Sequence, residues 1–130
     1  MDKKKYLQKY FDDLRKIITF DDKKILDLIK VSEIITKANN IGKKTLIFGN
    51  GGSAAIASHF SVDLTKNARI RCVNFNESDL LTCFSNDFGY EKWVEKCIEY
   101  YGDEHDVVIL ISAGGNSENM INGAKKAKEM

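Results

Sequence analysis

Hydrophobic residues recur at helical spacing through residues 1–42. The first stripe comprises Leu7, Tyr10, Phe11, Leu14, Ile17 and Ile18, and the second comprises Ile25, Leu28, Ile29, Ile35 and Ala38. Asp21 or Asp22 can cap the second segment, and Gly42 is a natural stop after it. The pattern therefore predicts two helices before the first strand.

From residue 44 onward, short apolar runs alternate with helical stretches. The segments predicted as strands are 44–48, 71–75 and 106–111, and those predicted as helices are 54–66, 78–85, 90–101 and a last one carrying Met120, Ile121, Ala124 and Ala127. Such alternation predicts an α/β domain with a parallel sheet and right-handed crossovers. No proline or low-complexity linker divides the chain, so we expect one domain over 1–130, with the helical pair 1–42 within it. Three strands make a thin sheet and the last helix lacks a following element, so a further C-terminal portion is expected.

Composition and charge narrow the class of protein. Of 130 residues, 43% are hydrophobic and 30% are charged, which is typical of a globular domain. The net charge of +1 provides no broad electrostatic field that would attract nucleic acid or an anionic membrane. The charged N-terminus lacks the apolar region of a signal peptide, and no run is long enough to span a membrane. Three cysteines without CxxC spacing fit free thiols, so a cytoplasmic location is expected.

Two Gly/Ser-rich loops each follow a predicted strand and precede a predicted helix. The first is Gly-Asn-Gly-Gly-Ser at 49–53 and the second is Ser-Ala-Gly-Gly-Asn-Ser at 112–117. Unpaired N–H groups and the positive end of a helix dipole make such a junction suitable for an anion. One loop alone is equally consistent with ordinary turn chemistry, but two in equivalent positions predict a phosphate site at one edge of the sheet. Neither is a Walker loop or a dinucleotide fingerprint.

Other candidate groups are ambiguous from spacing alone. His59 and Asp63 are four residues apart and share a helix face, which suits an acid–base couple, half a metal site or a structural hydrogen bond. Asn86 and Asp87 precede Phe88 and Gly89 and are consistent with an ordinary cap or turn.

The segments GNGGSAAIASHF, SNDFGYEKW and DVVILISAGGNS, in that order, resemble the sugar isomerase (SIS) domain family, and within it bacterial phosphoheptose isomerases. The resemblance runs from the N-terminal helices to Met130. It implies a flavodoxin-like three-layer α/β sandwich with a five-stranded parallel sheet, preceded by two helices. It also implies a homotetramer with active sites between subunits, and interconversion of sedoheptulose 7-phosphate and a heptose 7-phosphate for surface polysaccharides.

The resemblance also implies roles for individual residues. Those expected to bind the sugar or its phosphate are Asn50, Gly51, Gly52, Ser53, Asp87, Ser112, Gly114, Asn116 and Ser117. Asp63 stands at the position of the family's catalytic glutamate and is the candidate base. His59 lines the site, and with Asp63 it is a candidate ligand for a divalent metal such as zinc.

The chain also departs from the family pattern. Asp63 is one methylene shorter than glutamate, and Ala113 and Gly114 replace two hydroxyl residues. Asn67 stands in place of an arginine, for which Lys66 or Arg69 is an alternative. The family's second catalytic group, a histidine in an Arg-Ile-Gln-Glu-x-His segment, is not in this sequence. The favoured hypothesis is therefore a phosphosugar isomerase. The alternatives are a non-catalytic phosphosugar-binding or scaffolding module and an anion-binding module unrelated to sugars.

Overall fold

A computed structural model describes residues 2–130, which divide into two units, Met1–Glu33 and Ile34–Met130. The first unit contains α1 (Lys3–Ile18) and the beginning of α2 (Asp22–Asn40). The Asp2 carboxylate caps α1 by accepting hydrogen bonds from the N–H groups of Lys4 and Lys5, at 3.0 and 3.3 Å. Both predicted N-terminal helices are therefore present.

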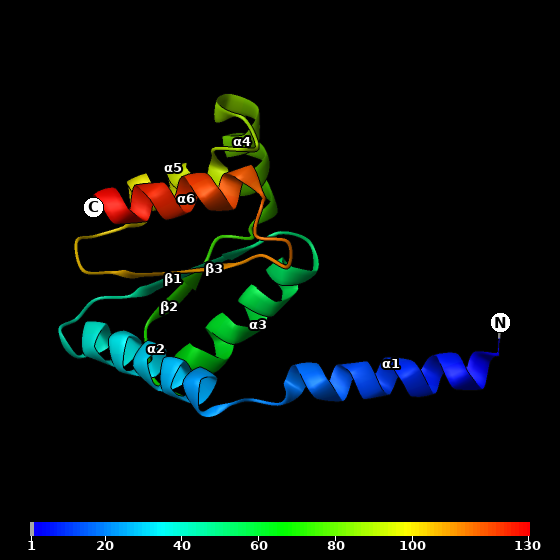
Figure 1. The fold of residues 1–130 in the computed structure, drawn as a ribbon. Coiled ribbons are helices and arrows are strands. Elements are labelled where there is room, and N and C mark those ends of the chain that lie inside the picture. The colour runs from blue at the N-terminus through cyan, green and yellow to red at the C-terminus, as the bar shows by residue number, and fades with distance from the viewer. Residues whose placement is uncertain (1) are drawn as a thin grey trace. The chain divides into compact units, whose positions relative to one another are not determined.

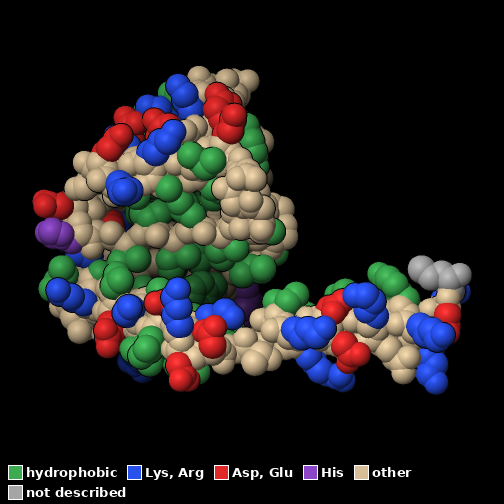
Figure 2. All heavy atoms as spheres, viewed as in Figure 1, with side chains coloured by type: hydrophobic (Ala, Val, Ile, Leu, Met, Phe, Trp, Pro, Cys, Tyr) green, Lys and Arg blue, Asp and Glu red, His purple; other side chains and the backbone are tan. Residues whose placement is uncertain are grey.

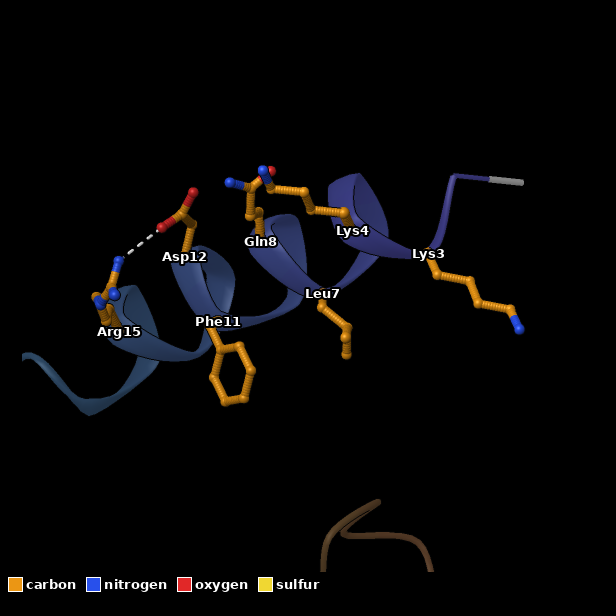
Figure 3. Close-up of a pocket in the computed structure, with 7 residues that line it drawn as sticks. All are labelled: Lys3, Lys4, Leu7, Gln8, Phe11, Asp12 and Arg15. Atoms are coloured by element: carbon orange, nitrogen blue, oxygen red, sulfur yellow. Dashed lines mark hydrogen bonds and ion pairs between the residues drawn. The ribbon is translucent and has the colours of Figure 1, made fainter.

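The apolar stripe of α1 is exposed within its own unit. Leu7 and Phe11 are each 51% exposed and line an open depression on the helix surface, where they point to the same side (Figure 3). On another side of the helix, Arg15 donates a hydrogen bond of 2.7 Å to Asp12. Charged residues of this helix thus form ion pairs with one another, while its apolar stripe stays largely exposed.

The second unit is a helix–sheet–helix sandwich (Figure 1). Its elements after α2 are β1 (Thr45–Gly49), α3 (Gly52–Lys66), β2 (Cys72–Asn74), α4 (Ser78–Phe88), α5 (Trp93–Tyr101), β3 (Val107–Ile111) and α6 (Glu118–Glu129). The strands are parallel in the order β2-β1-β3. Helices α5 and α6 cover one face of the sheet, and α3 lies on the other. This confirms the predicted three-layer α/β class.

Successive side chains of β1 point to opposite faces of the sheet. Leu46 and Phe48 join the buried cluster beneath α5 and α6, and Ile47 between them points to the opposite face. The Phe48 ring stacks on Phe75 at 5.2 Å and meets Trp93 edge-on at 5.7 Å. Because β1 is central and buried throughout, it forms the rigid base from which the first Gly-rich loop departs.

The helices meet closely where glycines allow it. A Cβ added at Gly123 of α6 would lie 2.4 Å from Val94 of α5, so this contact needs glycine. Figure 2 shows that hydrophobic side chains nevertheless remain visible at the surface in the middle of the second unit.

Most predicted boundaries agree with the structure to within one residue, and the larger differences lie at helix ends, including that of α4, which ends at Phe88 rather than at residue 85. Helix α3 begins at Gly52 rather than at residue 54, and α5 begins at Trp93 rather than at residue 90. Gly42 ends α2 as expected, with a φ of 80° and with the Lys43 N–H donating to the Ala38 carbonyl at 2.9 Å. The described residues form three strands; the five implied by the family resemblance would need others.

Candidate functional site

The two Gly-rich loops leave the same edge of the sheet. Gly49 at the end of β1 is the register partner of Ile111 at the end of β3, and the two strands are parallel. The loops at 50–53 and 112–117 therefore begin side by side, as predicted from their positions after the strands. Each leads into a helix, α3 or α6, with its N-terminus at this edge.

The first loop turns so tightly that its backbone conformation needs glycine. Gly51 has φ 53° and ψ −120°, a region that residues with a Cβ rarely adopt. The Ser53 N–H donates to the Asn50 carbonyl at 2.9 Å, and no side chain caps α3. A Cβ at Gly52 would meet nothing within 4 Å, so a ligand has room to approach the backbone there.

The second loop keeps the donors that the phosphate hypothesis needs. The Ser112 hydroxyl accepts a hydrogen bond of 3.1 Å from the Gly115 N–H, which shapes the loop and leaves the Ser112 proton free to donate. Ser117 is the N-cap residue of α6, but its hydroxyl makes no capping bond. Gly114 and Asn116 are exposed. Hydroxyl groups and backbone N–H groups are thus available at the positive end of α6.

The Asn50 side chain is already occupied by protein partners. Asn50 and Asn119 exchange two hydrogen bonds, of 3.0 and 2.9 Å, and the Tyr90 hydroxyl donates to Asn50 Oδ1 at 3.0 Å. Sequence analysis proposed Asn50 as a ligand contact and did not single out Asn119 or Tyr90. The only available signal was their position in the sequence. Asn119 lies two residues after Gly-Asn-Ser, and Tyr90 directly follows Asn-Asp-Phe-Gly.

Residues 9–130 match the SIS domain family. The chain belongs to this family. Its SIS domain is 38% identical over 117 residues to a phosphoheptose isomerase of Clostridium acetobutylicum, an alignment covering 85% of this chain and 59% of that protein. A phosphoheptose isomerase of Fusobacterium nucleatum is 36% identical over 123 residues, covering 91% of this chain and 63% of that protein.

A solved structure of a phosphoheptose isomerase from Neisseria gonorrhoeae superposes with a TM-score of 0.84 and 29% identity, covering 99% of this chain and 70% of that one. The fold of the SIS domain is therefore shared over essentially the whole chain. The chain spans about 60% of the length of the first two curated relatives.

His59 and Asp63 do lie together on α3, but at a distance from the loops. His59 Nε2 is 3.5 Å from Asp63 Oδ2, and the two side chains are 81% and 48% exposed. With Ala55, Ile56 and Phe60 they line an open depression of about 450 Å³. Ten residues separate Asp63 from Ser53, so the helical rise places them roughly 15 Å apart along α3. Within a single copy of the chain, Asp63 is thus separated from the first loop by almost three helical turns.

The Asp63 carboxylate also has a second neighbour. Asn67 donates a hydrogen bond of 3.0 Å to Asp63 Oδ1. The neighbour that the structure places beside the Asp63 carboxylate is thus a neutral amide. Among the described residues of the second unit, no arginine forms an ion pair with Asp63.

The His59–Asp63 pair fits one side of a metal site. An imidazole nitrogen and a carboxylate oxygen 3.5 Å apart can share one zinc ion, which binds such atoms at about 2.0–2.2 Å. Among residues 2–130 no cluster of three or more His, Cys, Asp or Glu side chains suits a metal ion. Within the described residues the pair could supply at most two ligands to a metal ion.

Asp87 lies exposed near the end of α4. Its carboxylate accepts a hydrogen bond of 3.0 Å from Asn86 and lies 3.6 Å from the Cys83 sulfur. The negative charge of Asp87 raises the pKa of the exposed Cys83 thiol. Burial raises the pKa of Cys72 to about 11 and that of Cys97 to about 12. These thiols are consequently poor nucleophiles at neutral pH.

No helix within the described part of the chain combines the length and apolarity required to cross a membrane.

Proposed function

We propose that the protein binds a phosphorylated sugar and serves as a phosphosugar isomerase of the phosphoheptose isomerase type. The observation that carries the proposal is the placement of two Gly/Ser-rich loops at one sheet edge, each opening a helix. Similarity to phosphoheptose isomerases supports a phosphorylated heptose as the sugar. The proposed substrate is sedoheptulose 7-phosphate or a related sugar phosphate.

The phosphate group is assigned to the second loop. Its oxygens accept hydrogen bonds from the hydroxyls of Ser112 and Ser117 and from N–H groups between Gly114 and Ser117. The positive end of α6 favours the same negative charge. Ala113 adds no hydroxyl, so the backbone supplies a larger share of the donors than in the family pattern.

The sugar is assigned to the first loop and to α4. Gly51, Gly52 and Ser53 offer backbone and hydroxyl donors, and Asp87 accepts hydrogen bonds from sugar hydroxyls. Figure 1 shows α3 and α6 beginning near the same edge, which supports one ligand contacting both loops.

Interconversion of an aldose and a ketose requires a base that removes a proton beside the carbonyl and an acid that polarises the carbonyl oxygen. Asp63 is the proposed base, and the acid comes from a group outside residues 1–130. Because Asp63 is separated from the loops of its own chain along α3, the proposal places it in the site of a neighbouring copy, in a cytoplasmic homotetramer. The exposed apolar stripe of α1 is consistent with such assembly.

A divalent metal such as zinc, held by His59 and Asp63 together with ligands from elsewhere, would polarise a sugar oxygen. His59 and Asp63 would hold the ion, and Asn67 orients the Asp63 carboxylate through its hydrogen bond.

The second candidate is a phosphosugar-binding module without catalysis. It is favoured by the same position of Asp63, which is exposed and hydrogen-bonded to Asn67. The two functions agree on the phosphate site and differ only in whether Asp63 takes a proton.

Titration with sedoheptulose 7-phosphate tests the binding site. Ser117→Ala is expected to weaken binding about 10- to 150-fold, because a hydrogen bond to a charged group contributes about 1.5–3 kcal/mol. Ser78→Ala, an exposed serine at the start of α4, is the matched control. Equal affinities for wild type and Ser117→Ala contradict the assignment of the phosphate to the second loop.

Isomerisation followed by NMR separates the two candidate functions. In a full-length protein that includes the acid group, Asp63→Asn is expected to reduce turnover about 10²–10⁴-fold with little loss of binding, while Asp63→Glu retains turnover. A full-length wild type that binds the sugar phosphate but does not isomerise it supports the binding module and refutes the catalytic role.

A further inference from the structure

Asn50, Asn119 and Tyr90 form a hydrogen-bonded group that joins the two Gly-rich loops. Asn50 lies in the first loop, and Asn119 lies in the first turn of α6 directly after the second loop. Their side-chain amides pair face to face although the residues are 69 positions apart in the sequence. Tyr90, in the turn between α4 and α5, adds its hydroxyl to the same Asn50 oxygen.

The acceptors in this group are saturated. Asn50 Oδ1 accepts from Asn119 and from Tyr90, and a carbonyl oxygen has two lone pairs. Asn119 Oδ1 accepts from Asn50 and also from the Met120 N–H at 3.0 Å. Asn119 is only 2% exposed, so leaving its amide unpaired would carry the full cost of burying a polar group. The pairing therefore fixes the orientation of both amides.

A further hydrogen bond holds Tyr90 in place from α6. Asn122, one helical turn after Asn119, donates 2.9 Å to the Glu91 carbonyl in the turn that carries Tyr90. The first loop, the start of α6 and the α4–α5 turn are thus connected pairwise by side-chain hydrogen bonds. The turn at 89–92 is in this way tied to the phosphate-binding edge.

Saturation also limits what Asn50 can offer to a ligand. Its oxygen has no free lone pair, and one of its two amide hydrogens is used by Asn119. Asn50 can therefore donate one hydrogen bond and accept none. Such a group recognises an acceptor oxygen, as in a phosphate or a carbonyl, and does not recognise a hydroxyl as a donor.

We infer that Asn119 and Tyr90 are positioning residues for the phosphosugar site. They hold the Asn50 side chain with its free N–H presented to an acceptor oxygen, and they keep the first loop in register with the start of α6. Neither residue needs to touch the sugar phosphate. The inference rests on the proposed function, because it concerns the same site.

Tyr90→Phe provides the cleanest test, because it removes only the hydroxyl from a side chain that is 50% exposed. Affinity for sedoheptulose 7-phosphate is expected to fall about three- to tenfold, with little change in melting temperature. The affinity for inorganic phosphate should change by less than about twofold, because that ion needs only the second loop and loses no hydrogen bond in the variant. Tyr100→Phe is the matched control: Tyr100 is 56% exposed and its hydroxyl makes no hydrogen bond within residues 2–130.

A double-mutant cycle adds a measurement that a purely structural role would not affect. If Tyr90 acts through Asn50, then Tyr90→Phe should have no further effect on affinity in an Asn50→Ala background. Additive losses would overturn the inference, as would equal affinities for Tyr90→Phe and Tyr100→Phe.

Failure of the proposed function gives a different result. If the wild-type protein binds no sugar phosphate, both that function and the positioning role are refuted. If it binds but the tyrosine variants do not differ, only the positioning role is refuted.

Discussion

Replacing Gly49 by alanine tests how tightly the first loop must fold back on β1. Gly49 is the buried last residue of the central strand. An added Cβ would lie 2.3 Å from the Ser53 carbonyl oxygen and 2.4 Å from the Ser53 carbonyl carbon. Both atoms belong to the backbone of the first turn of α3, so no side-chain rotation can relieve the overlap.

The magnitude follows from this geometry. Contacts of a Cβ shorter than 3.0 Å are essentially never seen, so the loop and the start of α3 must move by at least 0.7 Å, the difference between 3.0 and 2.3. Overpacking of this kind costs about 1–3 kcal/mol of unfolding free energy. For a domain of this size each kcal/mol lowers the melting temperature by roughly 4 °C. Sugar-phosphate affinity should fall as well, because the donors of the first loop are displaced.

Thermal unfolding followed by circular dichroism measures the effect, with Gly52→Ala as the control. Gly52 lies in the first turn of α3, and a Cβ there would meet nothing within 4 Å. Alanine at that position should leave the melting temperature unchanged or raise it slightly, because Ala is a better helix former than Gly by up to about 1 kcal/mol. Equal melting temperatures for wild type and Gly49→Ala would refute the close-approach argument.

Two predictions concern charge. The Asp106 carboxylate is 3% exposed, and although its burial acts to raise the pKa, hydrogen bonds from Lys44 and from backbone N–H groups lower it overall. Asp106→Asn should therefore reduce stability at pH 7 by about 1–3 kcal/mol, more than Asp103→Asn, whose carboxylate is 64% exposed. This stabilisation is lost as the pH falls below 3.8, so the difference in unfolding free energy between wild type and Asp106→Asn should narrow in acid. A difference that stays constant in urea unfolding from pH 7 to pH 3 would contradict this prediction. Cys83 should react faster with iodoacetamide at pH 8 in Asp87→Asn, because the charge that raises the thiol pKa is gone, and an unchanged alkylation rate would show that Asp87 has no such effect.

Local sequence patterns were sufficient to predict most of the fold. The run Val107–Ile111 between polar turns predicts a strand, and the structure has one with the same end at Ile111. Gly42 marks the end of α2 because it takes a positive φ there. Helix starts were less well predicted: glycine has a low helix propensity, so the onset of α3 at Gly52 was placed two residues too late.

The candidate site was predicted in part. The two loops meet at one edge because parallel strands share their direction, and that follows from the order of elements alone. The separation of Asp63 from Ser53 was also available in principle, since helical rise fixes it. The role of Asp63 in the site stays a prediction from the family resemblance, which implies active sites between subunits.

The sequence by itself determined the α/β class, the parallel strands and the two Gly/Ser-rich loops, because each depends on local periodicity and on turn residues. Only the tertiary structure decided what occupies the Asn50 amide. Its partners Tyr90 and Asn119 are 40 and 69 positions away, and no periodic pattern marks them. The packing of α5 and α6 on the sheet brings these side chains to the first loop. Once Asn119 is buried there, the cost of an unsatisfied amide selects Asn50 as its partner.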